Sequence, residues 1–261
     1  MKESNLVLTL ITAMVFVFLL GPLVIIIAAA FSPNEFLAFP PGGFSLRWFE
    51  NIFKVKMFMR TFEISMQVAV FGTLIALVIG IPAAYALSRY NFIGKNHINT
   101  IFISPVLIPG VVLGFTLLRY IVIAKNIPIF TGLLIGHTII ILPYIIRVIS
   151  SSLANFDYSI EEAAVSLGSS KIRTFFVVVL PNIRSGVIAA FILAFINSFN
   201  NVPVSVFLTG PGISTLPIQM LSYVEYYFDP TIAALSVVLM VFTVLLMIVI
   251  ERTLGLSYFA K

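Results

Sequence analysis

Residues 156–186 read FDYSIEEAAVSLGSSKIRTFFVVVLPNIRSG, the most strongly patterned polar stretch of a mostly apolar chain. Ser159 and Glu162 have the Ser-x-x-Glu spacing of a capping box, in which each side chain satisfies a backbone N–H near the other. This spacing predicts a helix that begins at about Ile160. Gly168 follows where a helix end needs a left-handed residue, a conformation that glycine adopts without a steric penalty. The helix is therefore predicted to end there.

A second short helix is predicted directly after this glycine. Ser169 or Ser170 can cap it, and apolar residues then recur at helical spacing. Pro181 marks the start of the next segment, because a proline in the first helical turn loses little by lacking an N–H. Two short helices joined by a glycine turn can form an ordinary amphipathic connector or a docking site for a separate protein, and the residues alone leave both open.

The rest of the chain has the composition of a membrane protein. Of its 261 residues 60% are hydrophobic and 10% are charged, whereas soluble proteins have about 45–50% apolar and about 25% charged residues. Its apolar runs are long enough to cross a bilayer, which takes roughly 20 residues of helix. We predict an all-α membrane protein, one transmembrane domain over residues 1–261, with six spans. The spans are predicted at residues 6–31, 61–87, 101–124, 129–150, 182–208 and 231–250.

Charge predicts the orientation of these spans. An even number of spans places both termini on one side of the membrane, and lysine and arginine favour the cytoplasmic side. Nine of the 15 basic residues fall on the side of the termini and six on the other side, which predicts cytoplasmic termini. The nine are Lys2, Arg89, Lys95, Arg147, Lys171, Arg173, Arg184, Arg252 and Lys261.

Gly72 and Gly80 in the second span indicate close helix packing.

A family resemblance decides between connector and docking site. Glu162-Ala163-Ala164, three residues, Gly168, eleven residues and then Leu180-Pro181 resembles the EAA loop of type I ABC importer permeases, with Val178 where the family usually has isoleucine. AAYALSRYNFIGK (residues 83–95) and ISPVLIPGVVLG (residues 103–114) are also typical of these permeases. The resemblance covers most of the chain, from about Thr61 to Ala234.

The resemblance implies a function and a set of partners. In that family the short helix of the EAA loop, between spans 4 and 5, is a cytoplasmic coupling helix that sits in a groove of a separate ATPase. Here it implies coupling residues Glu161, Glu162, Ala163, Ala164, Leu167, Gly168, Leu180 and Pro181. It also implies two ATPase subunits that bind ATP and magnesium, a second and non-identical permease subunit, and an extracytoplasmic solute-binding protein. The implied location is the bacterial inner membrane.

The solute is expected to be small and charged. SFNNVPVSVFLTGPGISTLPIQMLSYVEYYFDPTIAALS (residues 198–236) resembles permeases of the spermidine/putrescine branch, but Asn200 and Asn201 stand where that branch often has acidic residues. A polyamine is the predicted solute, and an amino acid derivative, an opine or a phosphonate is the alternative. The polar residues predicted to line the path are Asn197, Asn200, Asn201, Gln67 and Thr116.

Other classes of function have little support in the sequence. The chain has no Walker A motif, no Gly-x-Ser-x-Gly elbow, no His-Glu-x-x-His pair and no cysteine, so no catalytic residue, metal site or cofactor site is predicted. His137 is expected to be a packing residue. Basic residues form no stripe of the kind that binds nucleic acid. A secondary transporter or channel that works without ATP is the alternative, although the spans carry no acidic relay for proton coupling.

Overall fold

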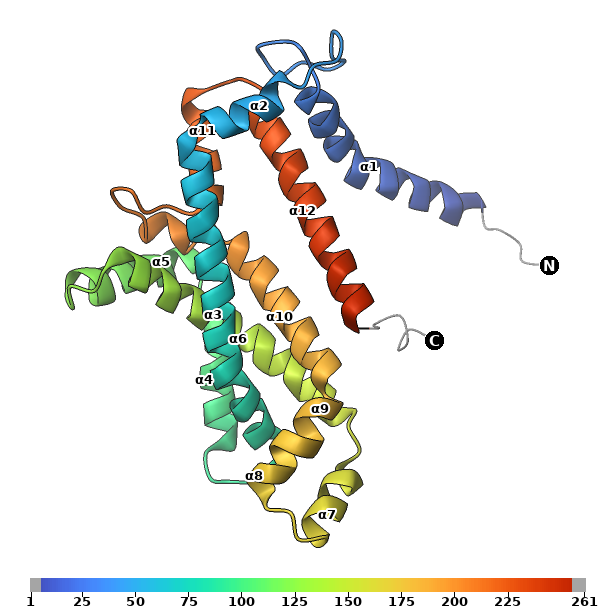
Figure 1. The fold of residues 1–261 in the computed structure, drawn as a ribbon, viewed down its shortest axis with the longest axis vertical. Helices are drawn as coiled ribbons and strands as arrows, with labels where there is room; N and C mark the ends of the chain where they lie inside the picture. Colours follow the sequence, from blue (N-terminus) through green and yellow to red (C-terminus); the bar gives the residue numbers. More distant parts are fainter. Residues whose placement is uncertain (1–5, 255–261) are drawn as a thin grey trace. The chain divides into compact units, whose positions relative to one another are not determined.

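The computed structural model describes residues 6–254, with side chains for residues 8–248, and helices make up most of them (Figure 1). Four helices are long and apolar enough to cross a membrane: α1 (Leu6–Ala30), α3 (Lys56–Arg89), α6 (Ile129–Ala154) and α12 (Thr231–Leu254). Two bent helix pairs raise the number to six if each pair is one span. The all-α prediction is therefore confirmed. Lys2 and Lys261, which enter the charge count, lie outside the described residues.

The shorter helices fill the segments between these four. They are α2 (Arg47–Lys54), α4 (Lys95–Leu107), α5 (Gly110–Leu117), α7 (Tyr158–Ser166), α8 (Lys171–Thr174), α9 (Leu180–Asn182), α10 (Arg184–Phe199) and α11 (Leu216–Tyr226). Two π-helical segments, η1 (Leu118–Ile123) and η2 (Phe175–Val179), and a 3-10 turn, η3 (Ser205–Phe207), complete the set. The chain forms two compact units, residues 6–60 with 219–249 and residues 61–218.

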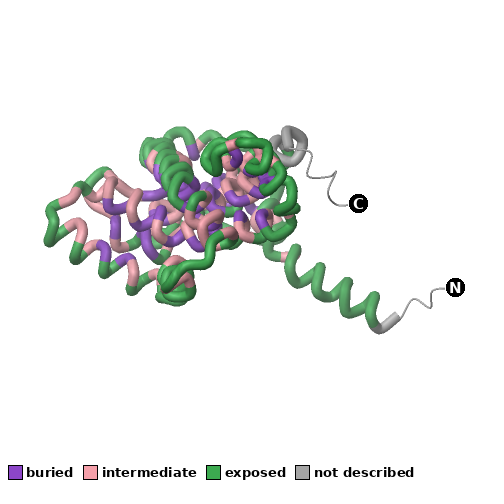
Figure 2. Tube along the Cα trace, turned by 90° about the horizontal axis from the view of Figure 1, so that it is seen from below, coloured by how far each residue is buried: buried purple, intermediate pink, exposed green. Residues whose placement is uncertain are grey.

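In the first unit, α1 leaves most of its apolar surface exposed (Figure 2). The loop after α1 is held by Trp48 of α2, whose Nε1 donates a hydrogen bond to the Ser32 carbonyl at 2.9 Å. Asn51 of α2 donates to the Thr231 hydroxyl at the start of α12, at 2.8 Å. Because these polar contacts lie beyond the end of α1, its apolar length is free to contact lipid or another membrane helix.

In the second unit, α3 packs closely against α6 along a stripe of small residues. The stripe recurs at every fourth position and is buried throughout: Gly72, Ala76, Gly80 and Ala84. A Cβ at Gly72 would lie 3.7 Å from Thr138 Oγ1, and one at Gly80 would lie 2.7 Å from Ile145 Cγ2. Membrane helices gain little from the hydrophobic effect when they associate, so they rely on close packing, which small residues permit. The close packing predicted for Gly72 and Gly80 is confirmed.

Replacing Gly80 by alanine is expected to lower the thermal stability of the purified protein in detergent. Ile145 is fully buried and β-branched, so it has few rotamers with which to make room, and overpacking of this kind costs about 1–3 kcal/mol. The matched control is Gly21→Ala in α1, where no atom lies within 4 Å of the added Cβ. A melting temperature for Gly80→Ala equal to that of the parent would show that the close contact of α3 and α6 at Gly80 does not limit the size of this residue.

The predicted third span, 101–124, is not a single straight helix. Ile108 is extended (ψ 129°), and the helical runs Lys95–Leu107 and Gly110–Ile123 are bent by 100°. Pro109 causes the break, because proline lacks an N–H and disfavours the helical conformation of the residue before it. After the break α5 packs close to the chain after α10, since a Cβ at Gly114 would lie 2.9 Å from the Val204 carbonyl oxygen.

The predicted fifth span, 182–208, does not coincide with a single helix either. A helical run begins before it, at Lys171, passes through Pro181 and bends by 72° into α10. The bend lies at Ile183, so Pro181 lies inside a helical run and does not begin one. Helix α10 ends at Phe199, and after it Asn201 Oδ1 accepts the Val204 N–H at 3.0 Å in the turn that leads to η3.

Candidate functional site

The polar stretch after α6 folds into α7, a glycine turn and α8. Asp157 caps α7, with its Oδ1 accepting the Ser159 backbone N–H at 2.9 Å, so the helix begins at Tyr158. The predicted capping box of Ser159 and Glu162 is therefore wrong, because the helix begins before Ser159 and both residues lie inside it. The same hydrogen bond stabilises the charged form and holds the pKa of Asp157 below its ordinary value.

The end of α7 follows the sequence prediction. Gly168 is left-handed, with φ +91°, and its N–H donates to the Val165 carbonyl at 2.9 Å. Ser169 N–H donates to the Ala164 carbonyl at 3.1 Å, which satisfies a second free carbonyl of the last turn. Ser170 then caps α8 by accepting the Arg173 N–H at 3.3 Å. The turn thus sets the direction of both helices.

One side of α7 is open. Glu162, Ala163 and Val165 are exposed, and Ala164 is half-buried. Leu167, which ends the helix, is 90% exposed. This side of α7 thus presents both charged and apolar side chains at the surface. Of the other predicted coupling residues, Leu180 is half-buried and Pro181 is exposed.

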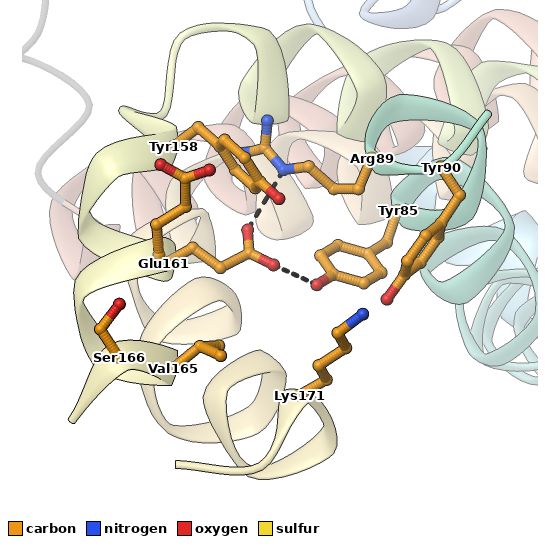
Figure 3. Close-up of a pocket in the computed structure, with 9 residues that line it drawn as sticks. Tyr85, Arg89, Tyr90, Tyr158, Glu161, Val165, Ser166 and Lys171 are labelled. Atoms are coloured by element: carbon orange, nitrogen blue, oxygen red, sulfur yellow. Dashed lines mark hydrogen bonds and ion pairs between the residues drawn. The ribbon is translucent and has the colours of Figure 1, made fainter. Parts of the chain in front are cut away.

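The other side of α7 is anchored by a carboxylate. Glu161 is 6% exposed, and it is the single buried residue of this helix. Its Oε1 accepts a hydrogen bond from the Tyr85 hydroxyl, and its Oε2 lies 3.2 Å from Arg89 Nε (Figure 3). That ion pair lacks hydrogen-bond geometry, so Nε and Oε2 have no hydrogen-bond partner. Both partners of Glu161 belong to the last turns of α3.

Arg89 also holds the end of α6. Its Nη2 donates to the Leu153 carbonyl at 3.4 Å, and its guanidinium lies 4.7 Å from the centroid of the Tyr158 ring. A pocket of about 380 Å³ opens beside these groups. Its lining, shown in Figure 3, is Tyr85, Arg89, Tyr90, Tyr158, Glu161, Glu162, Val165, Ser166 and Lys171.

The sequence prediction placed Glu161 among the residues that contact a partner, whereas the structure directs it toward α3. It also missed Tyr85 and Arg89, which lie in the quoted segment AAYALSRYNFIGK. Residues four apart share one face of a helix. Tyr85 and Arg89 have this spacing at the end of a predicted span, close to a polar loop. This pattern could have identified them as partners of a residue in the EAA loop.

The residues predicted to line a solute path lie on α3, on α5, and at or just after the end of α10 in the second unit. Gln67 on α3 and Thr116 on α5 are exposed, and the Thr116 hydroxyl donates to the Val112 carbonyl of its own helix at 2.8 Å. Asn197 is half-buried in α10, and Asn200 is exposed at its end. Asn201 accepts the Val204 N–H with its side-chain oxygen, in the turn before η3. The structure thus gathers the three asparagines at the broken end of α10, and the path itself stays a prediction.

His137 is a satisfied packing residue, as predicted. It is 1% exposed, and its Nδ1 and Nε2 lie 2.8 and 2.9 Å from the hydroxyls of Ser198 and Ser205. Ser205 already donates its proton to the Asn201 carbonyl at 2.6 Å. The Ser205 hydroxyl must therefore accept from His137 Nε2–H, which leaves Nδ1 to accept from Ser198. This neutral histidine joins α6 to both sides of the break after α10.

Comparison with known proteins identifies the family. Residues 76–254 match the family described as binding-protein-dependent transport system inner membrane component. The chain belongs to this family. The permease is 32% identical over 232 residues to the putrescine transport system permease protein PotI of Escherichia coli K12, covering 86% of the permease and 82% of PotI. It is 29% identical over 234 residues to the spermidine/putrescine transport system permease protein PotC of the same strain, covering 90% and 88%.

Solved structures support the same fold. A bacterial ABC transporter involved in the import of the acidic polysaccharide alginate contains a chain that superposes with a TM-score of 0.73 at 17% identity, covering 97% of the permease and 98% of that chain. The inward-facing MetNI methionine ABC transporter gives a TM-score of 0.63 at 19% identity, covering 77% and 96%. The predicted type I ABC permease fold is therefore confirmed, and the protein is a multi-pass inner-membrane permease subunit of an ABC importer.

Proposed function

We propose that the permease forms half of a translocation path for a polyamine and that α7 couples this path to a separate ATPase. The observation that carries the coupling is the open side of α7, where Glu162, Ala163 and Leu167 are exposed. The turn at Gly168 supports it, because a left-handed glycine gives the helix a sharp end that can seat in a groove. Leu180 and Pro181 belong to the proposed coupling segment, where the chain returns to the membrane.

The partners follow from this role. Two ATPase subunits bind ATP and magnesium and hydrolyse ATP, and the permease has no enzymatic activity of its own. Residues 1–261 of this permease act as one transmembrane domain, which forms one half of the path. A second, non-identical permease subunit supplies the other half. The exposed apolar surface of α1 supports such a contact between membrane helices. An extracytoplasmic binding protein delivers the solute. The termini and α7 face the cytoplasm, which the distribution of basic residues supports.

The proposed solute is putrescine, spermidine or a similar polyamine. PotI and PotC, whose names specify these solutes, support this choice. Asn197 and Asn200 lie at the C-terminal end of α10, where amide and backbone oxygens can accept hydrogen bonds from an ammonium group. The C-terminal end of a helix also carries partial negative charge. A cation can thus be recognised here without the acidic residues that the related branch often has.

Reconstitution of the complete transporter tests both parts of the proposal. The permease, its partner permease and the ATPase are placed in proteoliposomes, and uptake of labelled putrescine is measured with the binding protein outside. Uptake is expected to need ATP and to stop with a non-hydrolysable ATP analogue. Uptake without ATP would instead identify a secondary transporter or channel. Competition by an opine, a phosphonate or an amino acid derivative, but not by spermidine, would overturn the polyamine assignment.

A further inference from the structure

We propose that Glu161 is a positioning residue that ties α7 to the end of α3 through Tyr85 and Arg89, so that α7 and α3 move as one body during transport. The proposal rests on the coupling function proposed for α7. It adds the route by which movement of α7 reaches the membrane spans. Glu161 is thereby assigned to the permease itself and not to the ATPase contact.

Within the described part of the chain, α7 has no fully buried apolar residue. Its single buried residue is Glu161, and its apolar residues Ile160, Val165 and Leu167 are exposed. A short surface helix normally buries an apolar stripe against its neighbours. Here a carboxylate takes the place of that stripe. The position of α7 against α3 therefore depends on polar contacts, which have a defined direction.

The contacts of Glu161 fix both the position and the rotation of α7. The two carboxylate oxygens face different partners, the Tyr85 hydroxyl and Arg89 Nε, and these partners are four residues apart on α3. The side chains of Arg89 and Glu161 are only 12% and 9% exposed. A buried ion pair contributes little net stability but can specify one arrangement. Rotation of α7 about its own axis would separate both contacts together.

Arg89 extends this link to a second span. Its Nη2 donates to the carbonyl of Leu153, a fully buried residue at the end of α6. Helices α3 and α6 are in turn packed along the small-residue stripe from Gly72 to Ala84. A displacement of α7 is thus transmitted to the ends of two packed spans at once. The link through Glu161 is separate from the covalent connection of α7 to α8.

A direct role for Glu161 in binding the ATPase does not fit its surroundings. A protein partner that docks on α7 meets the exposed Glu162, the next residue along the chain, which points about 100° away around the helix. Reaching Glu161 would require breaking its contacts to Tyr85 and Arg89. The two adjacent glutamates therefore have different tasks, one outward and one inward.

A double substitution, Glu161→Gln with Arg89→Met, tests the link without leaving one buried charge unpaired. In the reconstituted transporter we expect the ATPase to bind within about twofold of the parent, while binding-protein-stimulated ATP hydrolysis and uptake fall about tenfold or more, a change of about 1.4 kcal/mol or more in coupling. Tyr85→Phe, which removes only the hydroxyl, is expected to give a smaller loss of the same kind. Lys95→Met, which removes an exposed hydrogen bond to Asn91, is the control and is expected to transport like the parent.

A reversible crosslink between α7 and α3 separates a positioning role from a purely structural one, because only a positioning role predicts that uptake changes when the link is made and broken. The chain has no cysteine, so Glu161→Cys with Arg89→Cys introduces the only two thiols in it. They lie beside a pocket of about 380 Å³, which admits a short bifunctional methanethiosulfonate that joins the two thiols through reducible disulfides. Crosslinking is expected to restore uptake, and reduction is expected to abolish it again.

Three results would overturn the proposal: parental uptake by the double variant, loss of ATPase binding in parallel with loss of uptake, or no recovery on crosslinking. Failure of the coupling function itself looks different, because the unsubstituted permease would then bind no ATPase. If the double variant does not insert into the membrane, Tyr85→Phe and the crosslinked pair decide the question, and parental uptake by Tyr85→Phe together with no recovery on crosslinking would reject the link.

Discussion

Replacing Leu167 by aspartate is expected to weaken binding of the ATPase to the permease by about ten- to a hundredfold. The leucine is 90% exposed in the isolated permease and ends the helix that we propose enters the ATPase groove. Burying a leucine side chain contributes about 1.5–3 kcal/mol, and each 1.4 kcal/mol is tenfold in affinity. A carboxylate adds the cost of removing a charge from water. The measurement is the affinity of purified ATPase for the permease pair held in lipid nanodiscs.

The matched control for this prediction is Ile93→Asp. Ile93 is a fully exposed apolar residue of the loop between α3 and α4, outside α7. The substitution changes charge and hydrophobicity in the same way, so general effects on solubility or insertion appear in both variants. Equal affinity of the ATPase for the Leu167→Asp variant and the parent would show that the end of α7 lies outside the interface.

The parts of the fold that depend on local chemistry could be predicted from sequence. Helices α1, α6 and α12 follow from apolar runs of sufficient length, which need no knowledge of their neighbours. The left-handed conformation of Gly168 and the cap at Ser170 follow from the few residues on either side. The coupling role of the EAA loop came instead from its resemblance to a family, and it stays a prediction.

The two broken spans could not be predicted in the same way. Membrane helices tolerate proline and glycine, so Pro109 and Gly110 inside an apolar run did not distinguish a break from a kink. The break after α10 is accompanied by the hydrogen bond of Asn201 to the Val204 N–H and by the contacts of His137 with Ser198 and Ser205. His137 is far from Ser198 and Ser205 in the sequence, and their side chains meet only when the helices pack.

The direction of Glu161 was missed for a related reason. Consecutive residues of a helix point about 100° apart, so of the two glutamates in the EAA loop only one can face a given partner. Sequence spacing cannot say which one does, because the answer depends on where Tyr85 and Arg89 of α3 lie. The structure resolves this by burying Glu161 and exposing Glu162. Helix α7 is therefore two-sided, with an exposed outer side that we propose as the contact surface and an inner polar anchor.

Replacing Gly168 by valine is expected to reduce ATP-driven uptake by about a hundredfold or more, the largest loss that we predict for a single substitution. At φ +91° a β-branched residue is strained by about 1–3 kcal/mol. The turn can relieve this strain by changing its backbone, and α7 then leaves the position that its polar anchor and its partner both require. Gly168→Asn, which tolerates the left-handed region, is expected to retain much of the uptake.

Gly94→Val separates backbone strain from loss of coupling. Gly94 also has a left-handed backbone, with φ +85°, and neither glycine has an atom within 4 Å of an added Cβ. The two valine variants thus carry a similar conformational cost with no steric clash, but only one of them changes the end of α7. Membrane insertion is expected to be similar in both, while uptake falls only for Gly168→Val. Equal losses of uptake would mean that strain alone, and not the placement of α7, accounts for the effect.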